Sequence, residues 1–169
     1  MVSVAEISDA LSAHPGVGAA VVAVVRHDGR DVTVAAVEPT EYLSGPVLRN
    51  HVRRRLGGDC GLTGVLVVER LPVVGGAVDV EFLAAAVADG RCTLFEDPRD
   101  DVERRVAEIW SAQMDVRPVG ATDDFLELGG DSLSALGIIA ALEAEFDRPL
   151  DVYEFISASS VRRLAEILR

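Results

Sequence analysis

The spacing of apolar residues changes once along the chain, between Asp89 and Asp100, and this change divides the sequence into two parts that must fold differently. Ahead of it, Val-rich runs typical of strands alternate with helical stripes. Behind it, apolar residues recur only at helical spacing. The stretch between them contains glycine, proline and mixed charges, which is typical of a linker. We therefore expect two small domains, residues 1–90 and 100–169, joined by a linker at residues 91–99.

The first part predicts an α+β subdomain, a small three-stranded sheet with helices. An apolar stripe that ends at a His-Pro-Gly stop predicts its first helix, and the pair Asp28-Gly29 indicates a hairpin between two strands. The run from Pro72 to Gly76 shows no alternation and predicts a loop. In order, we expect a helix at 4–13, strands at 18–27 and 31–37, a helix at 45–56, a strand at 65–70 and a helix at 80–88.

The second part predicts an all-α four-helix bundle with a long first loop. That loop, residues 117–130, contains three apolar residues that we expect to plug the bundle, namely Phe125, Leu126 and Leu128. The second helix carries an apolar stripe expected to be buried, made of Ala135, Ile138, Ile139, Leu142 and Phe146. The expected helices are 101–114, 132–146, 152–156 and 161–168.

Composition narrows the classes of function. With 49% hydrophobic and 26% charged residues, the chain has the composition of a folded globular protein. The formal net charge is -12, and no lysine occurs among its 16 basic residues. After Glu96, 8 arginines face 16 acidic residues. Such a field repels phosphate backbones, which argues against nucleic-acid partners, and it would attract a partner with a basic surface.

The two cysteines, Cys60 and Cys92, lack the spacing of metal ligands, so we expect reduced thiols and no metal site. The longest apolar run, Val17 to Val25, is too short to span a bilayer, and no signal peptide is visible at the N-terminus. These observations predict a cytoplasmic protein with no membrane partner.

Ser132 follows the pair Gly129-Gly130 at the start of a predicted helix, and its position has two interpretations. Its hydroxyl could cap the helix by accepting a backbone N–H. It could also be esterified to a phosphate, whose charge the positive end of the helix dipole would favour. A hydrolytic serine would need a base, and the three histidines, His14, His27 and His51, all lie in the first part. We therefore assign no catalytic residue.

The second part resembles a carrier domain of nonribosomal peptide synthetases. The resemblance rests on Asp101-Val102-Glu103, Ile109-Trp110, the run from Asp123 to Leu133, and Phe146. It implies that Ser132, flanked by Gly130 and Asp131, accepts phosphopantetheine from coenzyme A in a magnesium-dependent phosphopantetheinyl transferase. The arm would then hold an aminoacyl or peptidyl thioester for condensation, tailoring or thioesterase domains in antibiotic and other secondary metabolism. The alternative in the carrier class is an acyl carrier of a polyketide or fatty-acid pathway.

One flank of the second helix, starting at Ser132, contains Leu133, Leu136 and Ala140 and carries no charge. A smooth apolar flank beside the proposed arm predicts a surface where partner enzymes dock.

The first 90 residues resemble the small C-terminal subdomain of amino-acid-activating adenylation domains. The match includes His14-Pro15-Gly16-Val17, Leu48 to Leu56, Val65 to Pro72, and Gly76-Ala77-Val78-Asp79. In that family a lysine follows the glycine of the last motif, and here the residue is Ala77. The resemblance therefore implies a subdomain that is truncated and inactive by itself, with the carrier loaded in trans by a separate adenylation enzyme. It could be a remnant scaffold, an excised part of a synthetase, or a piece that completes an active adenylation enzyme with a separate large subdomain.

Overall fold

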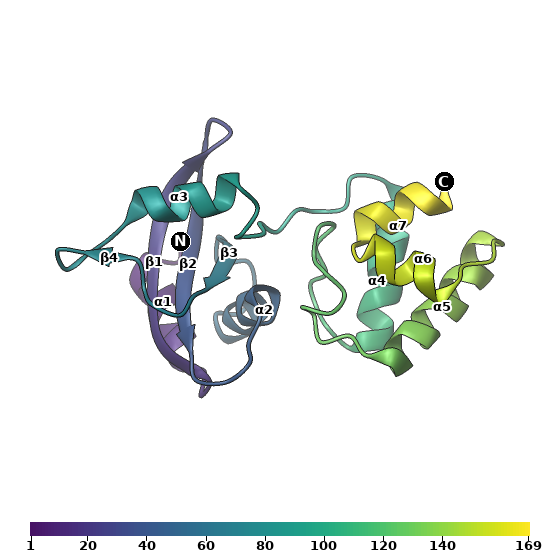
Figure 1. The fold of residues 1–169 in the computed structure, drawn as a ribbon, viewed down its shortest axis with the longest axis horizontal. Coiled ribbons are helices and arrows are strands. Elements are labelled where there is room, and N and C mark those ends of the chain that lie inside the picture. The colour runs from purple at the N-terminus through teal and green to yellow at the C-terminus, as the bar shows by residue number, and fades with distance from the viewer. The chain divides into compact units, whose positions relative to one another are not determined.

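The computed structural model describes residues 1–169, which form two compact units, residues 1–94 and 95–169 (Figure 1). Cys92 and Leu94 pack against the core of the first unit. In the second unit, the ring of Phe95 lies against Gly120, where an added Cβ would come within 2.9 Å of it. The segment expected to be a linker therefore has packing partners on both sides of the division.

The first unit contains a three-stranded sheet of β1 (Val17–His27), β2 (Arg30–Pro39) and β3 (Leu62–Val67), in the order β1-β2-β3. β1 and β2 are antiparallel, and β2 and β3 are parallel. The hairpin turn lies at Asp28-Gly29, both with positive φ, as a type I′ turn requires. β3 starts and ends about three residues earlier than the sequence pattern predicts, because its register is set by pairing with Thr33 to Val37 of β2.

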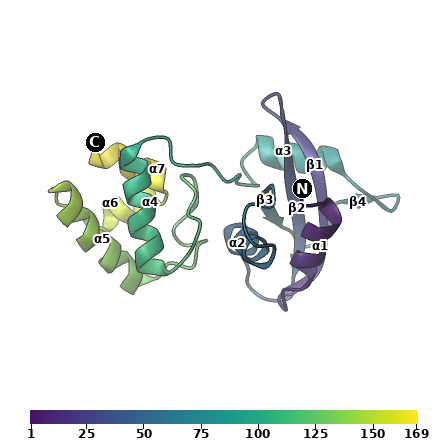
Figure 2. The same ribbon diagram turned by 180° about the vertical axis from the view of Figure 1, so that it is seen from behind.

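Helices cover both faces of this sheet. α1 (Val4–Ser12) and α2 (Gly45–Arg55) lie on one face, and α3 (Val80–Ala88) lies on the other (Figures 1 and 2). The side chains of β2 alternate between two cores: Ala35 and Val37 face the first pair of helices, and Val34 and Ala36 face α3. All four are fully buried, which explains why this strand is a continuous apolar run.

The predicted loop at Pro72–Gly76 is wrong in part. The chain forms a small ribbon of β4 (Val73–Val74) and β5 (Ala77–Val78), which turns at Gly75-Gly76. Strands of two residues are too short to show alternation, so the sequence pattern could not reveal them. The ribbon places Ala77 on an exposed strand.

The second unit is a bundle of α4 (Asp101–Met114), α5 (Ser132–Phe146), α6 (Val152–Ala158) and α7 (Val161–Leu168). Its core contains Trp110, Phe125 and Phe155, whose rings meet edge-to-face or tilted at centroid distances of 4.9–6.0 Å. The expected fold class, an α+β subdomain followed by a four-helix bundle, is confirmed.

Both cysteines are free and buried, and burial raises the pKa of the Cys92 thiol to about 11. None of the helices combines the length and the apolar character needed to cross a membrane.

Candidate functional site

The turn ahead of α5 is closed by a reciprocal capping box. Asp131 has an extended backbone and occupies the N-cap, where its carboxylate accepts the Ser134 N–H at 2.8 Å. In return the Asp131 N–H donates to the Ser134 hydroxyl at 2.9 Å. The bonds from Ser134 hold the pKa of Asp131 below its usual value. The interpretation in which Ser132 caps the helix is therefore wrong, because Asp131 occupies the N-cap and Ser134 completes the capping box.

Ser132 is the first residue of α5, and its side chain is exposed. Asp131 and Ser134 make the capping hydrogen bonds at the start of α5. The Ser132 hydroxyl takes no part in them and makes no hydrogen bond within the protein. It stands at the positive end of the helix dipole, where an anion is favoured. A hydroxyl in this position is open to an approaching enzyme.

The turn rests on a buried aromatic side chain. The Gly130 N–H donates to the Phe125 carbonyl at 3.0 Å, and a Cβ added at Gly130 would lie 2.4 Å from the Phe125 ring. Phe125 is only 2% exposed and is held by Trp110 and Phe155. Its backbone N–H donates to the Ser159 carbonyl at 2.9 Å, which ties the loop to the junction of α6 and α7. The position of Ser132 is therefore set by the core of the bundle.

An open apolar groove of about 450 Å³ lies beside Ser132. It is lined by the buried side chains of Phe125 and Ala135 and by Asp131 and Ser132. The remaining walls are apolar side chains from the loop, α5 and α6, namely Leu126, Leu136, Val152 and Ile156. An extended, mostly apolar group attached at Ser132 would have a surface on which to rest.

The predicted docking flank is exposed in the structure. Leu133 is 81% exposed and Leu136 is 57% exposed, and Ala140 is exposed as well. Sequence reasoning missed the other half of this apolar surface, which comes from the loop and from α6: Leu126, Val152 and Ile156. Leu126 was expected to be buried with Phe125 and Leu128, yet it points outward and is 59% exposed.

Residues 104–168 match the family model described as the phosphopantetheine attachment site. The second unit is therefore a carrier domain, and phosphopantetheine is its covalent prosthetic group.

The relatives extend the match to the first unit. The chain is 34% identical to the isonitrile lipopeptide synthase of Mycobacterium tuberculosis, over 99% of this chain and 7% of the relative. It is also 34% identical to a phosphinothricin tripeptide synthetase of Streptomyces viridochromogenes, over 97% of this chain and 16% of the relative. The chain thus spans less than a fifth of the length of these relatives. Over both units the chain is therefore similar to part of a nonribosomal peptide synthetase, and the phosphopantetheine attachment domain lies in its second unit.

Among solved structures, McyG A-PCP complexed with phenylalanyl-adenylate covers 98% of this chain at 23% identity, with a TM-score of 0.44 and 30% of its own length matched.

Proposed function

We propose that this chain is a peptidyl carrier protein in which Ser132 bears the phosphopantetheine arm. The observation that supports the assignment most directly is the exposed Ser132 hydroxyl, which stands without an internal partner at the first position of α5. The apolar groove beside it provides room for an attached group. No histidine lies within residues 95–169, so Ser132 lacks the base that a serine hydrolase needs.

In this proposal the residues of the chain hold Ser132 in place for the transferase and do not catalyse the reaction themselves. Ser132 Oγ forms a phosphodiester as the diphosphate bond of coenzyme A breaks and adenosine 3′,5′-bisphosphate leaves, and the serine proton passes to a base of the transferase. Asp131 and Gly130 fix the turn, and the helix dipole of α5 favours the new negative charge. The arm supplies a terminal thiol that holds the aminoacyl or peptidyl group.

The direct test incubates the full chain with coenzyme A, Mg²⁺ and a broad-specificity phosphopantetheinyl transferase. We expect the intact mass to rise by one arm and fragmentation to place the arm on the peptide that contains Ser132. A chain that gains no arm, or gains it on another serine, would contradict the assignment.

We further propose that the carrier is loaded in trans. Ala77 stands on the exposed ribbon where the resemblance to adenylation domains expects a lysine. A positive side chain there would stabilise the negative charge that builds on a reacting phosphate, and Ala77 cannot supply it. The first unit would then be a scaffold that contributes to the choice of loading enzyme.

We expect the 169-residue chain alone to show no amino-acid-dependent exchange of pyrophosphate into ATP. A mixture of the common amino acids should give the same signal as a reaction without amino acid. If a single amino acid raised the exchange clearly above this background, Ala77 would not mark an inactive subdomain, and the alternative of an adenylation enzyme would be favoured.

The docking flank gives a separate prediction. Leu136→Glu places a charge on an exposed apolar side chain next to Ser132, so loading by an adenylation enzyme that accepts the wild-type chain should slow by about tenfold. Ala144→Glu is the matched control, because it adds the same charge to an exposed position of α5 roughly 18 Å further along the helix from Ser132. Equal rates for the two variants would remove Leu136 from the docking surface.

A further inference from the structure

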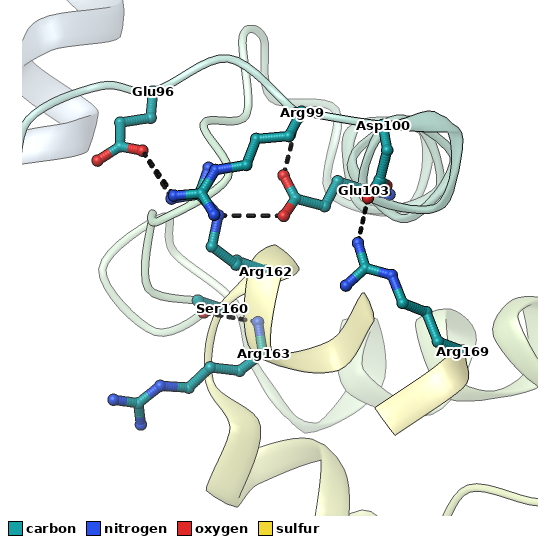
Figure 3. Close-up of polar contacts among 8 residues, drawn as sticks. All are labelled: Glu96, Arg99, Asp100, Glu103, Ser160, Arg162, Arg163 and Arg169. Atoms are coloured by element: carbon teal, nitrogen blue, oxygen red, sulfur yellow. Dashed lines mark hydrogen bonds and ion pairs between the residues drawn. The ribbon is translucent and has the colours of Figure 1, made fainter. Parts of the chain in front are cut away.

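A cluster of paired charges centred on Arg162 lies on the carrier unit (Figure 3). Glu103, in the first turn of α4, is only 1% exposed, and the Arg162 side chain of α7 is 14% exposed. Arg162 Nε donates to Glu103 Oε1 at 3.0 Å, and its Nη1 donates to Glu96 Oε2 at 2.6 Å. The second oxygen of Glu103 accepts the Arg99 N–H at 2.9 Å. One guanidinium therefore joins α4, α7 and the segment that precedes α4.

The electrostatics of the cluster depend on this pairing. Burial alone would raise the pKa of Glu103, but the hydrogen bonds from the Arg99 N–H and Arg162 outweigh it and lower the pKa. Burial likewise opposes the charge of Arg162, and the bonds to Glu96 and Glu103 raise its pKa. Arg162 Nη2 is buried without a partner. Because buried ion pairs are weak contributors to stability compared with apolar packing, a role in fixing one conformation explains this cluster better.

The same residues hold the loop that leads to Ser132. The Ala121 N–H donates to the Glu96 carbonyl at 2.8 Å, and the Arg162 N–H donates to the Ala121 carbonyl at 2.9 Å. Four residues later, Phe125 is bonded to Ser159, just ahead of α7. The loop is therefore bonded at two points, at Ala121 to the first turn of α7 and at Phe125 to the C-cap of α6, and the second point supports the Ser132 turn.

We propose that Arg162 is a positioning residue for the modification of Ser132. Together with Glu96 and Glu103, it clamps the segment 95–99 and the loop 119–125 onto α7, so that the turn is held in the form a transferase recognises. This inference rests on the proposed function, since it concerns how Ser132 is presented. It also makes residues 95–99 an integral part of the carrier unit.

The test compares Arg162→Met with Arg163→Met in the full chain. Arg163 is the neighbouring residue on α7 and its exposed guanidinium makes no ion pair (Figure 3). The readout is the rate of arm attachment, with coenzyme A, Mg²⁺ and a broad-specificity transferase, at a temperature where both variants are folded. If the loop adopts the conformation that the transferase recognises for only a fraction of the time, the KM for the carrier rises as that fraction falls. We therefore expect Arg162→Met to raise the KM by about tenfold with kcat little changed. Arg163→Met should behave as wild type.

Two further variants separate positioning from simple loss of stability. Arg162→Lys keeps the charge but not the fork that reaches both carboxylates, so it should recover part of the KM. Glu96→Gln removes the negative charge from one contact, which weakens that bond, and leaves the pair of Glu103 with Arg162 in place. It should raise the KM by about threefold, and it decides the question if Arg162→Met does not fold. Amide exchange should quicken at Phe125 and Gly130 in the affected variants.

The outcomes are distinct. If wild type accepts no arm, the proposed function fails. If wild type is modified, the deciding variant is Arg162→Met where it folds, and Glu96→Gln where it does not. The positioning role is overturned if that variant keeps both the wild-type KM and the wild-type amide exchange at Phe125.

Discussion

Replacing Ser132 with alanine is expected to abolish arm attachment, with no mass increase after prolonged incubation with transferase, Mg²⁺ and coenzyme A. The reason is chemical, because alanine has no oxygen with which to form the phosphodiester. The fold should be unaffected, since the Ser132 hydroxyl makes no internal hydrogen bond and the N-cap bonds of α5 come from Asp131 and Ser134. Thermal unfolding of the variant should therefore match that of wild type.

Ser134→Ala is the matched control, two residues away on the same helix turn. It removes the hydroxyl that accepts the Asp131 N–H, and this should cost about 1 kcal/mol of stability, as the loss of a helix cap does. It should still accept one arm. If Ser134→Ala were unmodified while Ser132→Ala gained the arm, the attachment site would have been assigned to the wrong serine.

The helices of the carrier unit could be predicted from the sequence because their ends carry local signals. Asp100, Asp131 and Ser160 each take the N-cap position and accept a backbone N–H, and the predicted bounds of α4, α5 and α7 are confirmed. α6 extends two residues further than predicted, to Ala158. It stops where Ser159 takes a left-handed conformation, which is unusual for a serine.

The apolar surface around Ser132 could be predicted only in part. Leu133, Leu136 and Ala140 share one face of α5, so helical periodicity finds them. Val152 and Ile156 join them through the packing of α6 against α5, about twenty residues away, which periodicity cannot reveal. Contacts between elements distant in sequence also create the cluster of Arg162 with Glu96 and Glu103, which no local pattern indicates.

The second large effect is expected at Gly130. Its backbone lies outside the left-handed region, so alanine is allowed there by conformation alone. The added Cβ, however, would lie 2.4 Å from the Phe125 ring, and that ring is confined by Trp110 and Phe155. Either the aromatic core or the turn must move. We expect Gly130→Ala to destabilise the carrier unit by about 2 kcal/mol and to slow arm attachment by about tenfold, because Ser132 moves with the turn.

Gly129→Ala distinguishes this steric effect from the loss of glycine flexibility. Gly129 has φ of 93°, and nothing lies within 4 Å of an added Cβ, so the substitution strains the backbone and meets no neighbour. Its cost should be about 1 kcal/mol, with a smaller loss in the rate of attachment. Phe125→Leu should lessen the effect of Gly130→Ala, since the atoms that collide are those of the outer ring edge. Thermal unfolding and attachment kinetics of the three single variants and the double variant measure this coupling. A larger loss at Gly129 than at Gly130, or strictly additive effects of Phe125→Leu and Gly130→Ala, would show that close packing beneath the turn is not what positions Ser132.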